Sequence, residues 1–98
     1  MPDFASLVFE VVSSIPPGRV MTYGDVAAAF GSRAPRAVGQ VMAYSGGGLP
    51  WWRVVRAGGH PPAGHADAAL EHYRAEGTPL RWSGDSYRVD LRLATYTA

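Results

Sequence analysis

Residues 22–44, TYGDVAAAFGSRAPRAVGQVMAY, contain two short helical patterns separated by a turn. Thr22 suits the N-cap of the first helix, Asp25 three residues later completes a capping box, and Gly31 ends the pattern. Pro35 suits the first position of the second helix, which we expect to continue to about the end of the stretch. Two short helices joined by a glycine-containing turn predict a helix-turn-helix unit.

Three further elements flank this unit. Apolar residues at helical spacing predict a helix over residues 4–15, with Asp3 as its N-cap and the Pro-Pro-Gly of residues 16–18 as its stop. Residues 66–76 form another amphipathic pattern, which ends at a glycine. Alternating apolar and charged residues over 80–93, interrupted by Ser-Gly-Asp-Ser, predict a two-stranded and half-buried hairpin.

These elements predict one domain over residues 1–98, mainly α with a small C-terminal β hairpin, of the winged helix-turn-helix type. Its 98 residues suffice for one modest core. The chain has no cysteine, which excludes disulfides and thiolate chemistry. The sequence shows neither a signal-peptide pattern nor a membrane span, so we expect a cytoplasmic protein without a membrane partner.

Basic residues concentrate in the middle of the chain. Between Arg19 and Arg56, five arginines accompany one acid, Asp25, which gives a local net charge of +4. The flanking segments carry net charges of −2 and −1. All nine basic residues are arginine, a bias that a GC-rich genome also produces. The distribution weakly favours a polyanionic partner.

The second helix of the quoted stretch has two unlike faces. At 100° per residue, one face gathers the apolar side chains that must meet the core, namely Ala37, Val38, Val41 and Met42. The opposite face carries Arg36, Gly39, Gln40 and Ala43. Small residues around one arginine allow another surface to approach the backbone closely. That surface is either a DNA groove or another helix of the protein, and the pattern favours neither.

Two adjacent tryptophans, Trp51 and Trp52, lie between Pro50 and Arg53 in a segment bounded by glycines. An indole offers a flat apolar face and one N–H donor, and it serves neither as a nucleophile nor as a proton carrier. Taken alone, the pair is best interpreted as core aromatics.

The remaining polar groups predict no catalytic or metal site. His60, His65, Asp67 and His72 lack a recognised spacing of metal ligands, and we interpret the histidines as exposed loop residues. The triple glycine at 46–48 lacks the Lys-Ser/Thr of a phosphate-binding loop. We therefore expect no metal, no cofactor and no enzymatic activity.

Three blocks of the chain share a known order: IPPGRVMTYGDVA at 15–27, PRAVGQVM at 35–42 and PWWRVV at 50–55. Together they resemble the DNA-binding domain of O6-alkylguanine-DNA alkyltransferases. In those enzymes the third block reads Pro-Cys-His-Arg-Val, and its Cys accepts the alkyl group. Trp51 stands at the Cys position, which is the mark of the alkyltransferase-like proteins. Residues 73–80 also resemble the end of such chains.

The resemblance implies a DNA-binding and base-flipping set consisting of Tyr23, Arg36, Gly39, Gln40 and Ala43. Tyr23 matches the tyrosine that crowds a DNA phosphate and helps to rotate the target nucleotide. Arg36 matches the arginine that enters the duplex and fills the vacated stack.

The resemblance also implies a lesion pocket formed by Tyr23, Pro50, Trp51, Arg53 and Val54. Backbone groups of Trp51 and Val54 would read the guanine edge, while Arg53 would tether the loop. Trp52 replaces the family histidine, and we expect it to point elsewhere and pack in the core. Loop 57–65 matches the family too poorly for any residue to be assigned there.

The function implied is non-enzymatic recognition of O6-alkylguanine in double-stranded DNA by nucleotide flipping, which flags the lesion for nucleotide excision repair proteins. A monomer is expected. The alternative is a winged-helix transcription regulator that binds undamaged DNA. Preference for alkylated over undamaged duplex distinguishes the two.

Overall fold

A computed structural model describes residues 3–98 of the chain. Two helix caps set the starts of its first two helices, α1 (Phe4–Ser14) and α2 (Tyr23–Ala29). The Asp3 carboxylate accepts a hydrogen bond from the Ser6 N–H at 2.8 Å. Thr22 and Asp25 form the reciprocal capping box, so both helices begin where the sequence predicts.

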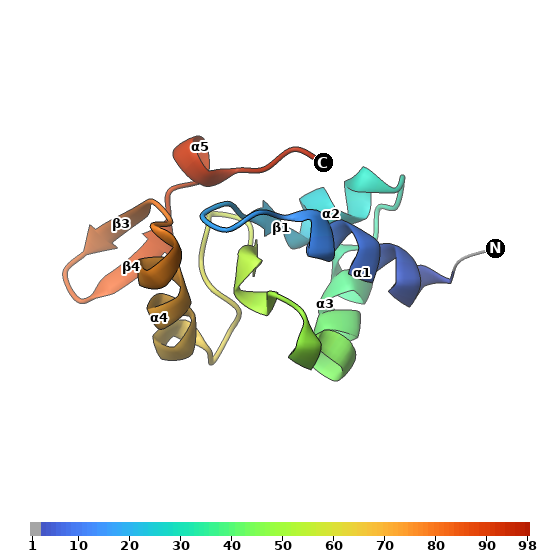
Figure 1. The fold of residues 1–98 in the computed structure, drawn as a ribbon, viewed down its shortest axis with the longest axis horizontal. Helices are drawn as coiled ribbons and strands as arrows, with labels where there is room; N and C mark the ends of the chain where they lie inside the picture. Colours follow the sequence, from blue (N-terminus) through green and yellow to red (C-terminus); the bar gives the residue numbers. More distant parts are fainter. Residues whose placement is uncertain (1–2) are drawn as a thin grey trace.

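Helix α3 (Pro35–Ser45) completes a three-helix unit with α1 and α2 (Figure 1). Three residues of its predicted core face are confirmed, because Val38 and Met42 are buried and Val41 packs against the same cluster, whereas Ala37 is only half-buried. That cluster also receives apolar side chains from the other two helices, from the residue after α1 and from strands β1 and β2, namely Val8, Val12, Ile15, Met21, Val26, Ala27 and Val54. The helix-turn-helix pair α2–α3 is thereby fixed on α1.

The middle of the chain contains short elements that the sequence pattern does not predict. The 3₁₀ turns η1 (Gly46–Gly48) and η2 (Trp51–Arg53) precede strand β2 (Val54–Val55). β2 pairs in parallel with β1 (Met21–Thr22) through the partners Met21 and Val54. This pairing holds residues 50–53, the tryptophan segment, beside the start of α2.

The C-terminal part is built from α4 (Ala66–Glu76) and the antiparallel strands β3 (Leu80–Ser83) and β4 (Ser86–Val89). Helix α4 has the predicted bounds, and Gly77 ends it with a φ of 70° that favours glycine. Tyr73 is fully buried in a second cluster, and its hydroxyl donates to the Trp52 carbonyl oxygen. The mainly helical fold with a C-terminal strand pair is confirmed.

The hairpin is shorter than predicted. The second strand ends at Val89, because the Asp90 carboxylate accepts from the Arg92 N–H and begins helix α5 (Leu91–Ala94). Leu91 and Leu93, assigned by their alternation to the strand, therefore lie in this helix, and Leu93 is exposed. The strand bridge between Val20 and Thr95 attaches the end of the chain to the helical unit.

The loop between β2 and α4 packs closely on the hairpin. Gly59 has a φ of 91°, and a Cβ there would lie 2.2 Å from the Val89 carbonyl oxygen, so only glycine fits. Val89 donates its N–H to the Gly59 carbonyl oxygen at 2.8 Å. The molecule extends 45 × 24 × 21 Å, with the hairpin and α1 toward opposite ends (Figure 1). None of the helices described has the length and apolar character needed to cross a membrane.

Candidate nucleic-acid interface

A cavity of about 390 Å³ opens between α3, the start of α2, the tryptophan segment and the loop before α4. Its wall is made mostly of small, apolar and aromatic residues: Tyr23, Gly39, Met42, Ala43, Gly47, Trp51, Pro62, Ala63 and His65. A concave, largely apolar site with few polar groups is typical of small-ligand pockets. Four of these residues, Tyr23, Gly39, Ala43 and Trp51, belong to the sets implied by the resemblance.

The outer face of α3 leads into this cavity. Arg36, Gln40 and Ala43 are exposed, and Gly39 is half-buried. A Cβ added at Gly39 would meet nothing within 4 Å, so the small side chain leaves open space outside the helix. Among residues 3–98, no helix occupies this space, which removes the alternative of a tight helix contact at Gly39 within that part of the chain.

Tyr23 is the first residue of α2 and lines the cavity. It packs partly against the helical core. Burial raises the pKa of its hydroxyl, and the Arg56 guanidinium opposes that shift. Tyr23 is therefore a neutral phenol at pH 7, and it would not repel a phosphate group.

Trp51 touches both core clusters and faces the cavity between two imidazoles. Its ring centroid lies 5.4 Å from that of His65 and 5.7 Å from that of His72. The Trp52 ring stands almost perpendicular to it, at 88°. These contacts pack the indole against three neighbouring rings and leave it in the cavity wall.

Trp52 points away from the cavity, toward α4. Its ring stacks on His72 with centroids 3.6 Å apart and an interplanar angle of 5°. Its Nε1 donates to the Glu76 carboxylate at 3.0 Å. The side chain packs against the second cluster but remains partly exposed, so its predicted core position is only partly correct.

Arg53 tethers the segment, as predicted. Its guanidinium donates to Glu76 through Nε and Nη2, at 3.1 and 2.6 Å, and to the Ile15 carbonyl oxygen at 3.0 Å. Glu76 also accepts the Gly18 N–H. Although burial opposes ionisation, hydrogen bonds from Arg53, Gly18 and Trp52 lower the pKa of Glu76. One carboxylate thus joins α4, the turn after α1 and the tryptophan segment.

Three residues of the predicted pocket set, Pro50, Arg53 and Val54, lie outside the cavity wall. Val54 is completely buried, and its N–H donates to the Trp51 carbonyl oxygen. These two backbone groups, expected to read a base, are bonded to each other. Pro50 and Arg53 instead support the segment that carries Trp51.

The sequence pattern missed the wall formed by Pro62, Ala63 and His65. The composition of residues 57–65 gave no signal for it. His65, the N-cap residue before α4, and His72 within α4 both contact Trp51 through their imidazole rings. His72 is therefore a half-buried helix residue, and its interpretation as an exposed loop histidine was wrong. Among residues 3–98, no three His, Asp or Glu side chains gather as metal ligands.

The arrangement described defines a small helix-turn-helix-containing domain with a cavity beside its second helix. A family model described as the DNA-binding domain of 6-O-methylguanine DNA methyltransferase matches residues 3–78. The chain belongs to this family, as an alkyltransferase-like protein with Trp51 at the cysteine position.

Relatives and solved structures agree with this assignment. The DNA base-flipping protein of Escherichia coli (strain K12) is 49% identical over 95 residues, which cover 92% of this chain and 71% of that protein. The DNA base-flipping protein of Vibrio parahaemolyticus serotype O3:K6 (strain AQ3810) is 37% identical over 62 residues, 60% of this chain and 62% of that protein.

The crystal structure of S. pombe Atl1 with damaged DNA containing O6-carboxymethylguanine has a TM-score of 0.85 at 25% identity. That of S. pombe ATL with DNA has a TM-score of 0.83 at 27% identity. Both comparisons cover 100% of this chain and 98% of the other chain.

Proposed function

We propose that this protein recognises O6-alkylguanine in duplex DNA by rotating the nucleotide into the cavity beside α3, and that it holds the base without repairing it. The observation that carries the proposal is Trp51, which lies in the cavity wall at the position of the family's alkyl-accepting cysteine. An indole provides a surface for an alkylated base and no nucleophile.

The cavity has the dimensions and surface for a flipped base. Its volume of about 390 Å³ lies within the usual range of small-ligand pockets, roughly 300–1,000 Å³. Aromatic contact with a base contributes roughly 1–3 kcal/mol. The mainly apolar wall would accommodate an added alkyl group, while flipping is least costly for a damaged, poorly paired base. Selectivity for the lesion follows from both effects.

The outer face of α3 suits entry into a groove. Gly39 and Ala43 would let the DNA backbone or base edges approach the helix closely. Exposed Arg36, one turn earlier, would insert its planar guanidinium in the vacated stack. The neutral hydroxyl of Tyr23 would lie near the rotated phosphate. These roles agree with the base-flipping names of the relatives and with the damaged DNA in the complex of S. pombe Atl1.

The chain has no chemistry for removing the alkyl group. It contains no cysteine, and among the described residues that line the cavity the ionisable ones are Tyr23 and His65. Burial raises the pKa of the Tyr23 hydroxyl and so disfavours the nucleophilic phenolate. A protein that only holds the lesion needs a second activity to remove it, and we propose that nucleotide excision repair proteins supply it.

Binding titrations with paired duplexes test the proposal. The two duplexes differ only in one guanine, which is O6-methylated in one of them. We expect clearly tighter binding to the methylated duplex in several sequence contexts. Equal affinity for both duplexes, or strong dependence on sequence, would contradict lesion recognition and favour a regulator of intact DNA.

A second assay tests the absence of chemistry. With DNA carrying a labelled O6-methyl group, no label should remain on the protein after denaturation. The protein should also slow repair of the same duplex by a genuine alkyltransferase, because both bind one lesion. Stoichiometric label on the chain would overturn the non-enzymatic assignment.

A further inference from the structure

The two faces of the C-terminal hairpin differ in chemical character, because side chains alternate between the faces of a strand pair. One face packs toward α4, where the Tyr87 ring meets that of Tyr73 and the Arg74 guanidinium lies over the Trp82 ring. The register places four exposed residues on the other face: Arg81, Ser83, Ser86 and Arg88. The strand positions of this outer face therefore carry two guanidinium groups and two hydroxyls, without a carboxylate or an apolar side chain.

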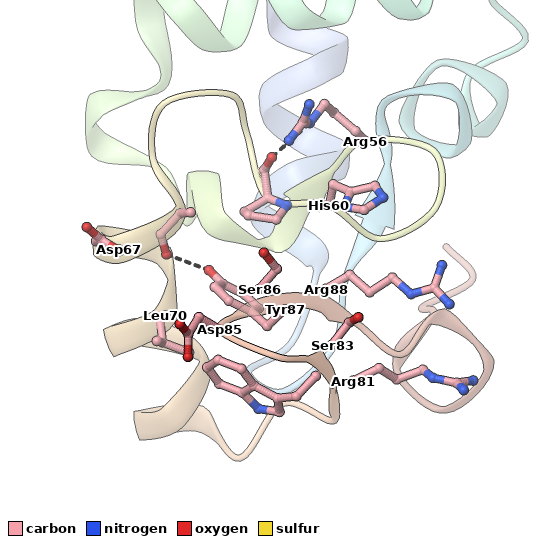
Figure 2. Close-up of a pocket in the computed structure, with 13 residues that line it drawn as sticks. Arg56, His60, Asp67, Leu70, Arg81, Ser83, Asp85, Ser86, Tyr87 and Arg88 are labelled. Atoms are coloured by element: carbon pink, nitrogen blue, oxygen red, sulfur yellow. Dashed lines mark hydrogen bonds between the residues drawn. The ribbon is translucent and has the colours of Figure 1, made fainter.

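Arg81 and Arg88 form a pair of like charges on the outer face. They lie directly opposite each other in the antiparallel register, and Figure 2 shows their side chains extending side by side in the same direction. Like charges placed directly opposite destabilise a strand pair. Within residues 3–98, neither guanidinium forms an ion pair with a carboxylate. An anion between them would relieve the repulsion and accept charge-assisted hydrogen bonds from both.

The composition of the outer face favours phosphate as that anion. Arginine and serine side chains are among the groups that donate to phosphate oxygens in DNA complexes. The planar guanidinium also matches a phosphate group with two parallel hydrogen bonds. An acidic polypeptide would need apolar anchors for stable binding, and the outer face offers none.

A groove of about 710 Å³ connects this face with the residues that follow β2 (Figure 2). Arg56 and His60 line it together with the arginine pair. The Arg56 Nε donates to the Pro61 carbonyl oxygen at 2.9 Å, which fixes this side chain on the loop. The Arg56 charge also opposes the rise in the pKa of Tyr23, a residue of the lesion cavity. Positive charge thus continues from the lesion cavity to the hairpin.

We propose that the outer face of the hairpin binds backbone phosphates of the duplex that carries the lesion, through Arg81 and Arg88. This step rests on the proposed function, since it starts from a nucleotide rotated past Tyr23 into the cavity. One turn of duplex, about 34 Å, fits within the 45 Å length of the molecule. Asp67 and Asp85 lie on the other side of the hairpin from the arginines and would repel a phosphate there, which directs the backbone to the outer face (Figure 2).

Salt dependence of DNA binding tests the contact. Fluorescence anisotropy measures affinity for a duplex of roughly 21 base pairs, about two turns, with one central O6-methylguanine. R81Q/R88Q should weaken binding about tenfold at low salt. The slope of log K against log salt concentration should fall in magnitude by about 2, because each phosphate contact contributes roughly 0.9. R81K/R88K keeps both charges, so it should keep the slope and most of the affinity.

The matched control is R74Q/R92Q, which removes the same charge from exposed positions that do not line the groove. It should weaken binding less than about twofold and leave the slope almost unchanged. Equal losses in R81Q/R88Q and R74Q/R92Q, or an unchanged slope in R81Q/R88Q, would overturn the proposal.

Shortening the duplex shows where the arginine pair acts. Cutting one flank to about two base pairs, roughly 7 Å, should abolish the difference between the wild type and R81Q/R88Q, because that duplex ends before the hairpin. Cutting the other flank equally should leave the difference intact. Arg36→Ala, whose proposed contact is at the lesion itself, should lose affinity on all three duplexes. A loss in R81Q/R88Q that neither truncation abolishes would contradict a backbone contact beyond the lesion.

Two measurements keep the test independent of folding and of lesion recognition. R81Q/R88Q removes a repelling pair and should be at least as stable as the wild type in urea. In the wild-type chain, the NMR resonances of the Arg81 and Arg88 Nε–H groups should shift on addition of duplex, and the absence of both shifts would overturn the proposal. Equal wild-type affinity for methylated and undamaged duplex would refute lesion recognition alone, since the salt slope on undamaged duplex still measures the hairpin contact.

Discussion

The two sides of the segment from Pro50 to Arg53 differ sharply in their polar contacts. On the cavity side, Trp51 meets the His65 ring and small apolar groups, and its surroundings offer few hydrogen-bonding partners. On the α4 side, Trp52 and Arg53 donate three hydrogen bonds to one carboxylate, that of Glu76. Consecutive residues thus face an open, apolar space and a closed polar network.

This difference assigns a role to each side: the cavity side binds a ligand, and the α4 side stabilises the folded segment. Apolar surface that stays exposed in the cavity adds little to the stability of the folded state. Covering that surface with a ligand is favourable and contributes to the free energy of binding. A satisfied buried network does the reverse, because each partner would lose its bonds on unfolding or truncation. Substitutions on the α4 side should therefore lower stability and keep the ratio of affinities for alkylated and undamaged duplex, whereas substitutions on the cavity side should lower that ratio. Trp51 also packs against both core clusters, so its truncation should lower stability as well.

The largest effect is expected from breaking the support side. Glu76→Ala leaves the Arg53 guanidinium, with a side-chain exposure of 15%, without its carboxylate. Loss of one partner from a fully buried ion pair costs roughly 3–5 kcal/mol, and this partly buried pair should fall at or below the lower end of that range. We expect a decrease of that order in the free energy of unfolding, measured by urea denaturation. Glu71→Ala, an exposed position on the same helix, is the control and should be almost neutral. A Glu76→Ala protein as stable as the control would show that the network does not hold the segment.

The next largest effect is expected on α3, which lines the cavity through Gly39, Met42 and Ala43. Arg36→Ala removes the group proposed to fill the vacated stack, so the cost of flipping, a few kcal/mol, is no longer offset. Affinity for O6-methylguanine duplex should fall by about 2 kcal/mol, or roughly thirtyfold, with unchanged stability.

Exposed Arg92 provides the matched control for charge, and Gly39 provides a test of close approach. Arg92→Ala should weaken binding only slightly. Gly39→Leu should fold normally, because the space outside the helix is open, yet it should weaken binding to every duplex. Equal losses for Arg36→Ala and Arg92→Ala would mean that α3 does not enter the DNA.

The sequence predicted those parts of the fold that local chemistry determines. Caps at Asp3 and Thr22 and the terminal Gly77 define helix ends within a few residues. The period of 3.6 residues separated the two faces of α3. The strand pair β1–β2 escaped prediction, because two residues per strand show no period. Asp90 looked like the polar position of an alternating strand and is instead the N-cap of α5.

The candidate site was only partly predictable, because its wall and its support come from distant positions. Trp51, Gly39 and Tyr23 were indicated by family blocks, and all three line the cavity. Glu76 was not indicated, since its partners lie 23 to 58 residues away in sequence. His65 could be assigned to the site only from the structure, in which its ring packs against Trp51. Nothing in the local pattern of that loop determines where it packs.

A smaller and more selective effect is expected at the two tryptophans. Trp51→Ala should reduce affinity for the alkylated duplex by roughly 1–3 kcal/mol, the contribution of one aromatic–base contact. Affinity for undamaged duplex rests on phosphate contacts and should remain nearly unchanged.

Trp52→Ala reverses this pattern, because it removes the stack on His72 and the bond to Glu76. Its melting temperature should fall, while the methylated and undamaged duplexes keep their affinity ratio when both are measured well below that temperature. If Trp51→Ala binds both duplexes as the wild type does, the two sides have been assigned wrongly.

The smallest expected effect is the pH dependence that Glu76 gives to the free energy of unfolding. Hydrogen bonds from Arg53, Gly18 and Trp52 hold the pKa of Glu76 below its ordinary value of 4.5, against the opposing influence of burial. The folded state therefore binds the proton more weakly than the unfolded state does, and protonation favours unfolding. The stabilisation is complete above the unfolded pKa and is lost as the pH falls through the lower, folded pKa.

Glu76→Gln keeps the shape and one acceptor but cannot ionise. Its free energy of unfolding should start below that of the wild type at pH 7 and decline less steeply below about pH 4.5. Glu71→Gln, measured by the same urea titrations, should follow the wild-type curve. Parallel curves for Glu76→Gln and the wild type would mean that the carboxylate on the α4 side gains nothing from its charge.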